Sequence, residues 1–191
     1  MKNIAIFASG SGSNAEEIIR YFQKRNSAQV KFIITNNPHA GVINRAKGLG
    51  VPSFVFSNSE LAQSEDLLDF LQQNYIDFIV LAGYLKMIPA ALVDAFPQAI
   101  INIHPALLPD FGGMGMHGEK VHAAVLASGQ AKSGITIHFV NEAYDEGKII
   151  FQANCPVMPG DTVESLSKRV LQLEHAHYAP TIETIVSQRD F

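Results

Sequence analysis

The chain has 191 residues, 47% of them hydrophobic and 17% charged, so it can bury one sizeable core and is expected to form a single domain over residues 1–191. Its net charge of −4 and its scattered basic residues argue against nucleic acid as a partner and favour small molecules. A single cysteine, Cys155, excludes an internal disulfide, and no apolar run suits a signal peptide or a membrane span, so we expect a cytoplasmic protein with a buried thiol.

The N-terminal half alternates short β-rich runs with helical patterns. We predict strands over residues 4–8, 30–35, 51–56 and 78–82. We predict helices over residues 14–24, 42–49, 61–73 and 90–96. This alternation implies right-handed crossovers and a Rossmann-like α/β fold, in which a mainly parallel central sheet carries helices on both faces.

The pattern changes after the apolar run of residues 99–104, which we also predict to be a strand. Residues 135–140 and 149–157 then read as two strands, and the loop between them is short enough to pair them antiparallel. A last helix is predicted over residues 164–186, with Pro180 as a possible bend. The sequence contains no repeat, low-complexity tract or linker, so a second domain is not expected.

The first predicted turn, Ser9 to Asn14, reads S-G-S-G-S-N between a strand and a helix. Small residues there let backbone N–H groups approach an anion at the helix N-terminus. The third glycine of a dinucleotide fingerprint and the lysine of a Walker loop are both missing, so a mononucleotide-type phosphate is the better interpretation. The alternative is a tight turn in which Ser13 or Asn14 only caps the helix.

Asn102 and His104 interrupt the apolar run of residues 99–104. Alternate side chains of a strand share a face, and Pro105 places this pair at the carboxyl end of the strand, where ligands gather in open α/β sheets. An amide beside an imidazole suits polarising a carbonyl and moving a proton. The alternative is that Asn102 caps the strand edge and His104 is a core histidine with a hydrogen-bond partner.

Asp145 lies in the predicted connection between the two antiparallel strands, from which it could reach back toward the Asn/His pair. A carboxylate near an imidazole favours the imidazolium and orients it. The alternative is a solvated loop acid. No metal is predicted, because His175 and His177 diverge on a helix and neither His117 nor His122 has metal-ligand spacing.

Further motifs accompany these residues over essentially the whole chain. They are S-G-S-G-S-N at Ser9 to Asn14, V-L-A-G-Y at Val80 to Tyr84, I-N-I-H-P-A-L-L-P at Ile101 to Pro109, H-F-V at His138 to Val140, D-E-G at Asp145 to Gly147 and R-V-L-x-L-E-H at Arg169 to His175. The set resembles the formyltransferase family that uses 10-formyltetrahydrofolate, and its first motif is similar to that of the branch acting on glycinamide ribonucleotide. The resemblance implies a formyltransferase fold and transfer of the formyl group of 10-formyltetrahydrofolate, as cosubstrate, to the amine of glycinamide ribonucleotide in de novo purine biosynthesis. The amine would attack directly, without a covalent enzyme intermediate.

The resemblance also implies roles for individual residues, with no metal. The catalytic set would be Asn102, His104 and Asp145; Asn102 and a protonated His104 would stabilise the formyl oxygen, and Asp145 would keep His104 charged. The substrate phosphate would bind Gly12, Ser13 and Asn14, and its ribose Glu174. The folate would bind Leu85, Lys86, Met87, Ile88, Asn141, Glu142, Ala143 and Tyr144. Residues 1–100 would thus form a phosphate-binding half and residues 101–191 a folate-binding and catalytic half, in a monomer or homodimer.

The sequence departs from the family pattern in two places. Ala106 stands where many members carry serine, and segment 111–118 is longer and richer in glycine than the usual loop, so we align His122, not His117, with the family histidine. This segment is predicted to be a mobile flap over the site, with an inserted surface loop as the alternative.

Three other functions would use some of the same residues. A formyl-folate hydrolase would share the Asn/His/Asp set but resembles a longer chain with a regulatory domain. A tRNA-directed relative would carry a further basic domain. A non-catalytic nucleotide sensor would use only the glycine turn.

Overall fold

The computed structural model describes residues 1–63 and 65–188. Its strands are β1 (Lys2–Phe7), β2 (Ala28–Thr35), β3 (Ser53–Val55), β4 (Phe78–Leu81), β5 (Ile100–His104), β6 (Lys132–Phe139) and β7 (Ile149–Pro156). Its helices are α1 (Ser13–Gln23), α2 (Gly41–Gly48), α3 (Asn58–Gln63), α4 (Glu65–Gln73), α5 (Ala90–Ala95), α6 (Glu119–Ala127) and α7 (Val163–Gln188).

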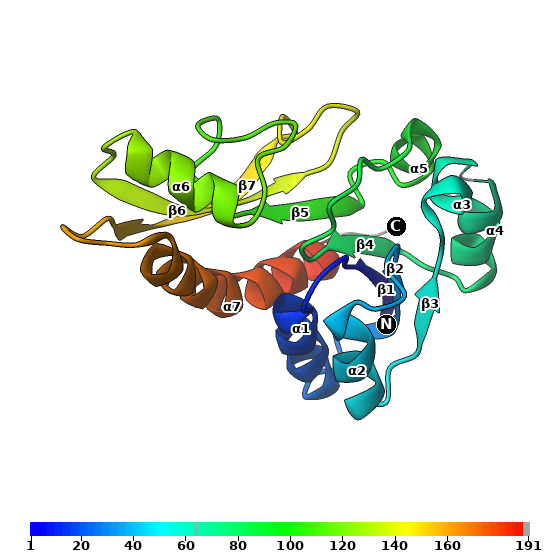
Figure 1. Ribbon diagram of the computed structural model, residues 1–191. Coiled ribbons are helices and arrows are strands. Elements are labelled where there is room, and N and C mark those ends of the chain that lie inside the picture. The colour runs from blue at the N-terminus through cyan, green and yellow to red at the C-terminus, as the bar shows by residue number, and fades with distance from the viewer. Residues whose placement is uncertain (64, 189–191) are drawn as a thin grey trace.

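Within this part of the chain the strands form one seven-stranded sheet in the order β3-β2-β1-β4-β5-β6-β7 (Figure 1). The strands from β3 to β5 are parallel, and β6 runs antiparallel to both β5 and β7. Helix α1 packs against α2 and α7, and α4 packs against α5, so helices surround the sheet. The predicted Rossmann-like fold with an antiparallel C-terminal strand pair is confirmed.

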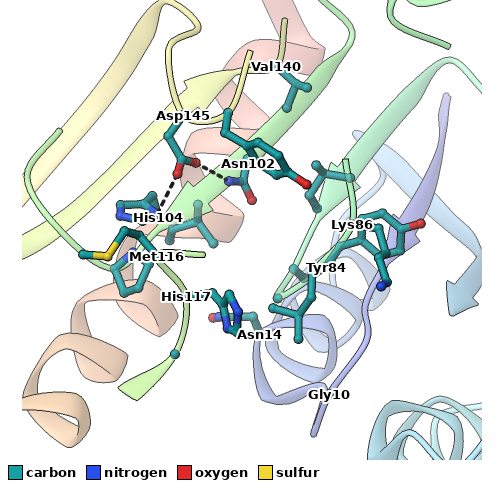
Figure 2. Close-up of a pocket in the computed structure, with 18 of the residues that line it drawn as sticks. Gly10, Asn14, Tyr84, Lys86, Asn102, His104, Met116, His117, Val140 and Asp145 are labelled. Atoms are coloured by element: carbon teal, nitrogen blue, oxygen red, sulfur yellow. Dashed lines mark hydrogen bonds and ion pairs between the residues drawn. The ribbon is translucent and has the colours of Figure 1, made fainter. Parts of the chain in front are cut away.

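The carboxyl ends of β1, β4 and β5 meet at one edge of the sheet, where a cavity opens (Figure 2). This edge is the one that open α/β sheets use for ligands, because the loops that leave neighbouring parallel strands converge there. The segments after β1 and β4 carry residues 12–14 and 85–88, and β5 itself carries Asn102 and His104.

One predicted helix differs from the structure, and one helix of the structure was not predicted. The predicted helix 61–73 is replaced by α3 and α4, and α3 begins earlier because the Ser57 hydroxyl accepts the Glu60 amide at 3.3 Å while the Glu60 carboxylate accepts the Ser57 amide at 2.6 Å. This reciprocal pair is a capping box, which fixes a helix start. Helix α6 was not predicted, because it follows the glycine-rich segment and has a weak hydrophobic pattern.

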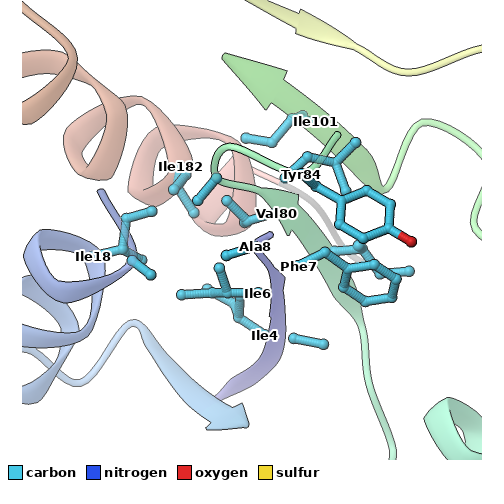
Figure 3. Close-up of a cluster of buried hydrophobic side chains, with 14 of the residues drawn as sticks. Ile4, Ile6, Phe7, Ala8, Ile18, Val80, Tyr84, Ile101 and Ile182 are labelled. Atoms are coloured by element: carbon cyan, nitrogen blue, oxygen red, sulfur yellow. The ribbon is translucent and has the colours of Figure 1, made fainter. Parts of the chain in front are cut away.

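The core is one cluster of buried side chains that extends through both halves of the sequence (Figure 3). Ile6 of β1, Val80 of β4, Ile101 of β5 and Ile182 of α7 all belong to it. Tyr178 of α7 is fully enclosed, and its hydroxyl donates to the carbonyl oxygen of Leu81 at 2.8 Å. The C-terminal helix is therefore packed against strands from the N-terminal half.

The sequence also predicted a buried thiol at Cys155 and no membrane span. Cys155 is a free, buried thiol on β7, as predicted, and burial raises its pKa. Among the described residues, no helix combines the length and the apolar character that crossing a membrane requires.

Candidate active site

The cavity at the carboxyl edge of the sheet has a volume of about 560 Å³. It is lined by residues 10–14 after β1, residues 82–88 after β4, the end of β5, residues 113–118, the β6–β7 connection and one side of α7. Its volume falls within the range of ligand pockets in proteins. The site therefore draws on segments from both halves of the sequence.

Asn102, His104 and Asp145 lie together on one side of this cavity (Figure 2). The Asp145 carboxylate is 3.5 Å from Asn102 Nδ2 through Oδ1 and 3.5 Å from His104 Nδ1 through Oδ2. Asn102 and His104 share a face of β5, as the strand alternation predicted. His104 Nε2 lies 2.8 Å from the carbonyl oxygen of Phe111, so it donates there, and both ring nitrogens face acceptors.

The β6–β7 connection presents Asp145 to the cavity through a tight return of the chain. Asp145 itself takes a positive φ of 57°, a strained conformation that is concentrated at functional sites. A Cβ on Gly147 would lie 1.6 Å from the Phe139 carbonyl oxygen, so this position requires glycine. The Asp145 side chain is 10% exposed and accepts the Gly113 amide at 3.0 Å, so the alternative of a solvated loop acid is wrong.

Opposing effects set the protonation of the pair. Burial lowers the pKa of His104, and the Asp145 charge and the Phe111 carbonyl offset this only in part, so His104 titrates below its ordinary value. Burial raises the pKa of Asp145, but hydrogen bonds from His138 and Gly113 and the charges of the two histidines outweigh it, so Asp145 titrates below its ordinary value. The expectation that Asp145 keeps His104 charged at neutral pH is corrected: the carboxylate acts in that direction, and desolvation acts more strongly against it.

His138 on β6 lines the cavity and Thr136 on β6 supports the turn after β5, and neither was predicted as a functional residue. His138 Nε2 lies 3.5 Å from Asp145 Oδ1 and 3.3 Å from Asn102 Nδ2. The Thr136 hydroxyl donates to the Ala106 carbonyl at 2.7 Å and thereby fixes the turn after β5. The available signal was cross-strand pairing, since β6 places His138 opposite Asn102 and Thr136 opposite His104.

The S-G-S-G-S-N turn lies across the cavity from these residues. Gly12 is the N-cap residue of α1 with a φ of 79°, and no side chain caps the helix, so the alternative role of Ser13 or Asn14 as a cap is wrong. The Asn14 amide instead donates to the Glu174 carboxylate at 2.5 Å, which joins the turn to α7. Burial raises the pKa of Glu174, and the Asn14 hydrogen bond only partly offsets this.

The residues predicted to bind the folate fall around the same cavity, with one exception. Those that line it are Leu85, Lys86, Met87, Ile88, Asn141, Ala143 and Tyr144. Leu85 and Met87 expose about half of their apolar side chains, at 49% and 48%, which suits contact with a flat aromatic ligand. Glu142 is exposed and does not line the cavity.

The glycine-rich segment 111–118 contributes to the cavity, so it is not a surface loop remote from the site. Both histidines near it line the cavity: His117 is exposed, while His122 on α6 is buried and burial lowers its pKa. His122 Nδ1 is enclosed without a hydrogen-bond partner among the described residues. Whether the segment moves as a flap stays a prediction.

The sequence predicted a site without a metal ion. In residues 1–63 and 65–188, no three His, Cys, Asp or Glu side chains are grouped so that they could hold a metal ion.

Comparison with known proteins identifies the class to which this fold and site belong. Residues 2–182 match the family described as formyl transferase, and the chain belongs to that family. The family predicted from the sequence motifs is thereby confirmed.

The chain is also similar to individual proteins of this family. The chain is 45% identical over 194 residues to a chloroplastic phosphoribosylglycinamide formyltransferase of Arabidopsis thaliana, with 98% of this chain covered, and spans 66% of that relative's length. It is 36% identical to the phosphoribosylglycinamide formyltransferase of Bacillus subtilis, covering 97% of this chain and 95% of the relative. The crystal structure of glycinamide ribonucleotide transformylase 1 from Symbiobacterium toebii superimposes with a TM-score of 0.91 at 35% identity, covering 99% of this chain and 89% of that one.

Proposed function

We propose that this protein transfers the formyl group of 10-formyltetrahydrofolate to the amine of glycinamide ribonucleotide, a step of de novo purine biosynthesis. The observation that carries the proposal is the position of Asn102, His104 and Asp145 between a phosphate-type turn and an apolar rim in one cavity. The names of the relatives from Arabidopsis thaliana and Bacillus subtilis support the same substrate.

The ribonucleotide would bind at the α1 end of the cavity. Backbone N–H groups of Gly12, Ser13 and Asn14 at a helix N-terminus provide donors and a favourable dipole for a phosphate. Glu174 lies beside Asn14 and can accept hydrogen bonds from ribose hydroxyls. A ligand held at both points would direct its amine toward His104.

The folate would bind between the segment after β4 and the β6–β7 connection. Leu85, Met87 and Ile88 supply apolar surface for the flat ring system, and Asn141, Ala143 and Tyr144 line the cavity from the β6–β7 connection. The side chains that line this part of the cavity are thus suited to binding a folate.

In the proposed reaction, the amine nitrogen forms a bond to the formyl carbon, and the bond from that carbon to the folate nitrogen then breaks. The Asn102 amide stabilises the negative charge on the formyl oxygen; one such donor lowers the barrier by about 3 kcal/mol. His104 Nδ1 receives the amine proton and returns it to the folate nitrogen, while Phe111 holds Nε2–H and Asp145 stabilises the transient imidazolium. The proposed attack is direct, without a covalent enzyme intermediate, and the residue between Asn102 and His104 is Ile103, which is not a nucleophile.

The test is an absorbance assay of folate turnover with Asn102→Ala, His104→Ala and Asp145→Ala. Each variant is expected to lose activity by about 100-fold or more while keeping the wild-type circular dichroism spectrum. Asp110→Ala, an exposed loop acid outside the cavity, is the control and should keep wild-type activity. Near-normal transfer in the three folded variants would refute the assignment.

The same assay separates the alternative functions. Transfer requires the ribonucleotide, hydrolysis of the formyl folate does not, and a nucleotide sensor gives no absorbance change. A cytoplasmic location and a monomeric or dimeric state remain parts of the proposal, and the plant relatives are named as chloroplastic proteins.

A further inference from the structure

Helix α2 packs against the S-G-S-G-S-N turn on the side away from the cavity. The Val42 amide donates to the Gly10 carbonyl at 3.2 Å, and Arg45 Nε donates to the Ser11 carbonyl at 2.8 Å. Gly41 allows this approach, since a Cβ there would lie 3.2 Å from the Cα and carbonyl oxygen of Ser11. Two successive carbonyl groups of the turn are therefore held by α2.

These hydrogen bonds determine where the following amides point. In a trans peptide the C=O and the next N–H lie on opposite sides of the C–N bond. A Ser11 carbonyl drawn toward Arg45 therefore turns the Gly12 N–H the other way, and Gly12 lines the cavity. Arg45 does not line the cavity itself, so it can act on a ligand only through the turn.

The Arg45 side chain is also held in place by an ion pair. Its Nη1 contacts the Glu16 carboxylate of α1, and Glu16 also accepts Arg20 Nη2 at 2.8 Å. Arg45 and Arg20 thus share one carboxylate and have similar exposure, 43% and 52%, but it is Arg45 that donates the hydrogen bond to the turn. Arg20 is therefore a suitable control position for substitutions of Arg45.

We propose that Arg45 is a positioning residue for the substrate phosphate, which orients the Gly12 amide by holding the Ser11 carbonyl. The inference rests on the proposed function, since it assumes that this turn binds the phosphate of the ribonucleotide. It assigns no contact between Arg45 and the ligand.

The test compares wild type, Arg45→Ala, Arg45→Lys and Arg20→Ala with two substrates, glycinamide ribonucleotide and the phosphate-free glycinamide ribonucleoside. Arg45→Ala should raise KM for the ribonucleotide by about tenfold, the effect of one charge-assisted hydrogen bond, without changing kcat or KM for the folate. With the ribonucleoside it should equal wild type. Arg20→Ala should equal wild type with both substrates, and Arg45→Lys, which keeps the charge but lacks Nε, should retain most of the defect.

The outcomes that overturn the inference are specific. Unchanged KM in Arg45→Ala, an equal loss with both substrates, an equal defect in Arg20→Ala, or full rescue by Arg45→Lys would each exclude positioning through Ser11. Calorimetric titration with glycinamide ribonucleotide separates this failure from that of the proposed function. Weaker binding to Arg45→Ala without any formyl transfer by wild type would refute the function and keep the inference, and equal binding would refute the inference alone.

Discussion

His104 has the central role in the proposed reaction, and its surroundings affect its pKa in opposite directions. Burial disfavours the charged ring, while Asp145 at Nδ1 and the Phe111 carbonyl at Nε2 stabilise it. A base for an amine should be neutral at rest and should hold a proton briefly. The His104 ring is therefore neutral before the reaction. When it takes up a proton, the Asp145 carboxylate and the Phe111 carbonyl stabilise the charged ring.

The balance predicts the result of removing the carboxylate charge. Asp145→Asn eliminates the interaction that raises the pKa of His104, so that pKa should fall further below its ordinary value, and the imidazolium signal should appear only at lower pH. The measurement is an NMR titration of the His104 ring. Glu146→Gln, a neutralised and exposed neighbour in the same connection, is the control and should leave the titration unchanged. An unchanged or raised pKa in Asp145→Asn would contradict the coupling.

At the scale of elements, the first βα turn depends on one backbone conformation. Gly12 has a φ of 79°, and a Cβ there would lie 2.5 Å from the Cβ of Val42 on α2. Gly50 has a similar φ of 71°, but a Cβ there would meet nothing within 4 Å. Substituting each glycine by alanine therefore distinguishes the cost of backbone strain, expected at both positions, from that of a steric clash, expected only at Gly12.

We expect Gly12→Ala to lower the free energy of unfolding by about 2–4 kcal/mol, since a backbone cost of about 1–2 kcal/mol is joined by displacement of α2. Gly50→Ala should lose only the backbone contribution. Denaturant unfolding checks both values, and the ribonucleotide KM should rise only in Gly12→Ala. Equal losses of stability in the two variants would show that contact with Val42 does not matter.

The sequence was a good guide to those elements whose signals are local. Alternating strands and helices predicted a mainly parallel sheet, and the spacing of Asn102 and His104 predicted their shared face. His138 was missed because its role depends on β6 pairing with β5 rather than only with β7, which is a long-range contact. The Phe111 carbonyl and the Gly113 amide were also missed, because a backbone group leaves no signal in residue identity.

At the scale of the whole molecule, the two proposed halves are closely tied together. The cavity takes the S-G-S-G-S-N turn from the first half and Glu174 from the second, and Asn14 joins them. Tyr178 of α7 forms a second connection, because its buried hydroxyl donates to Leu81 of β4 and, at 3.3 Å, to the Ile101 carbonyl of β5. Such ties imply that the halves fold as one cooperative unit.

Tyr178→Phe tests this connection with a minimal change of shape. The substitution removes the hydroxyl that donates to the buried Leu81 carbonyl, so the free energy of unfolding should fall by about 1–3 kcal/mol. Tyr75→Phe, at an 81% exposed tyrosine, should change it by less than about 0.5 kcal/mol. Thermal unfolding followed by far-UV circular dichroism and by NMR of the Ile6 and Ile137 methyl groups should give one shared midpoint in each protein. Separate midpoints for the two isoleucines, one in each half, would show that the halves unfold independently and that α7 does not couple them.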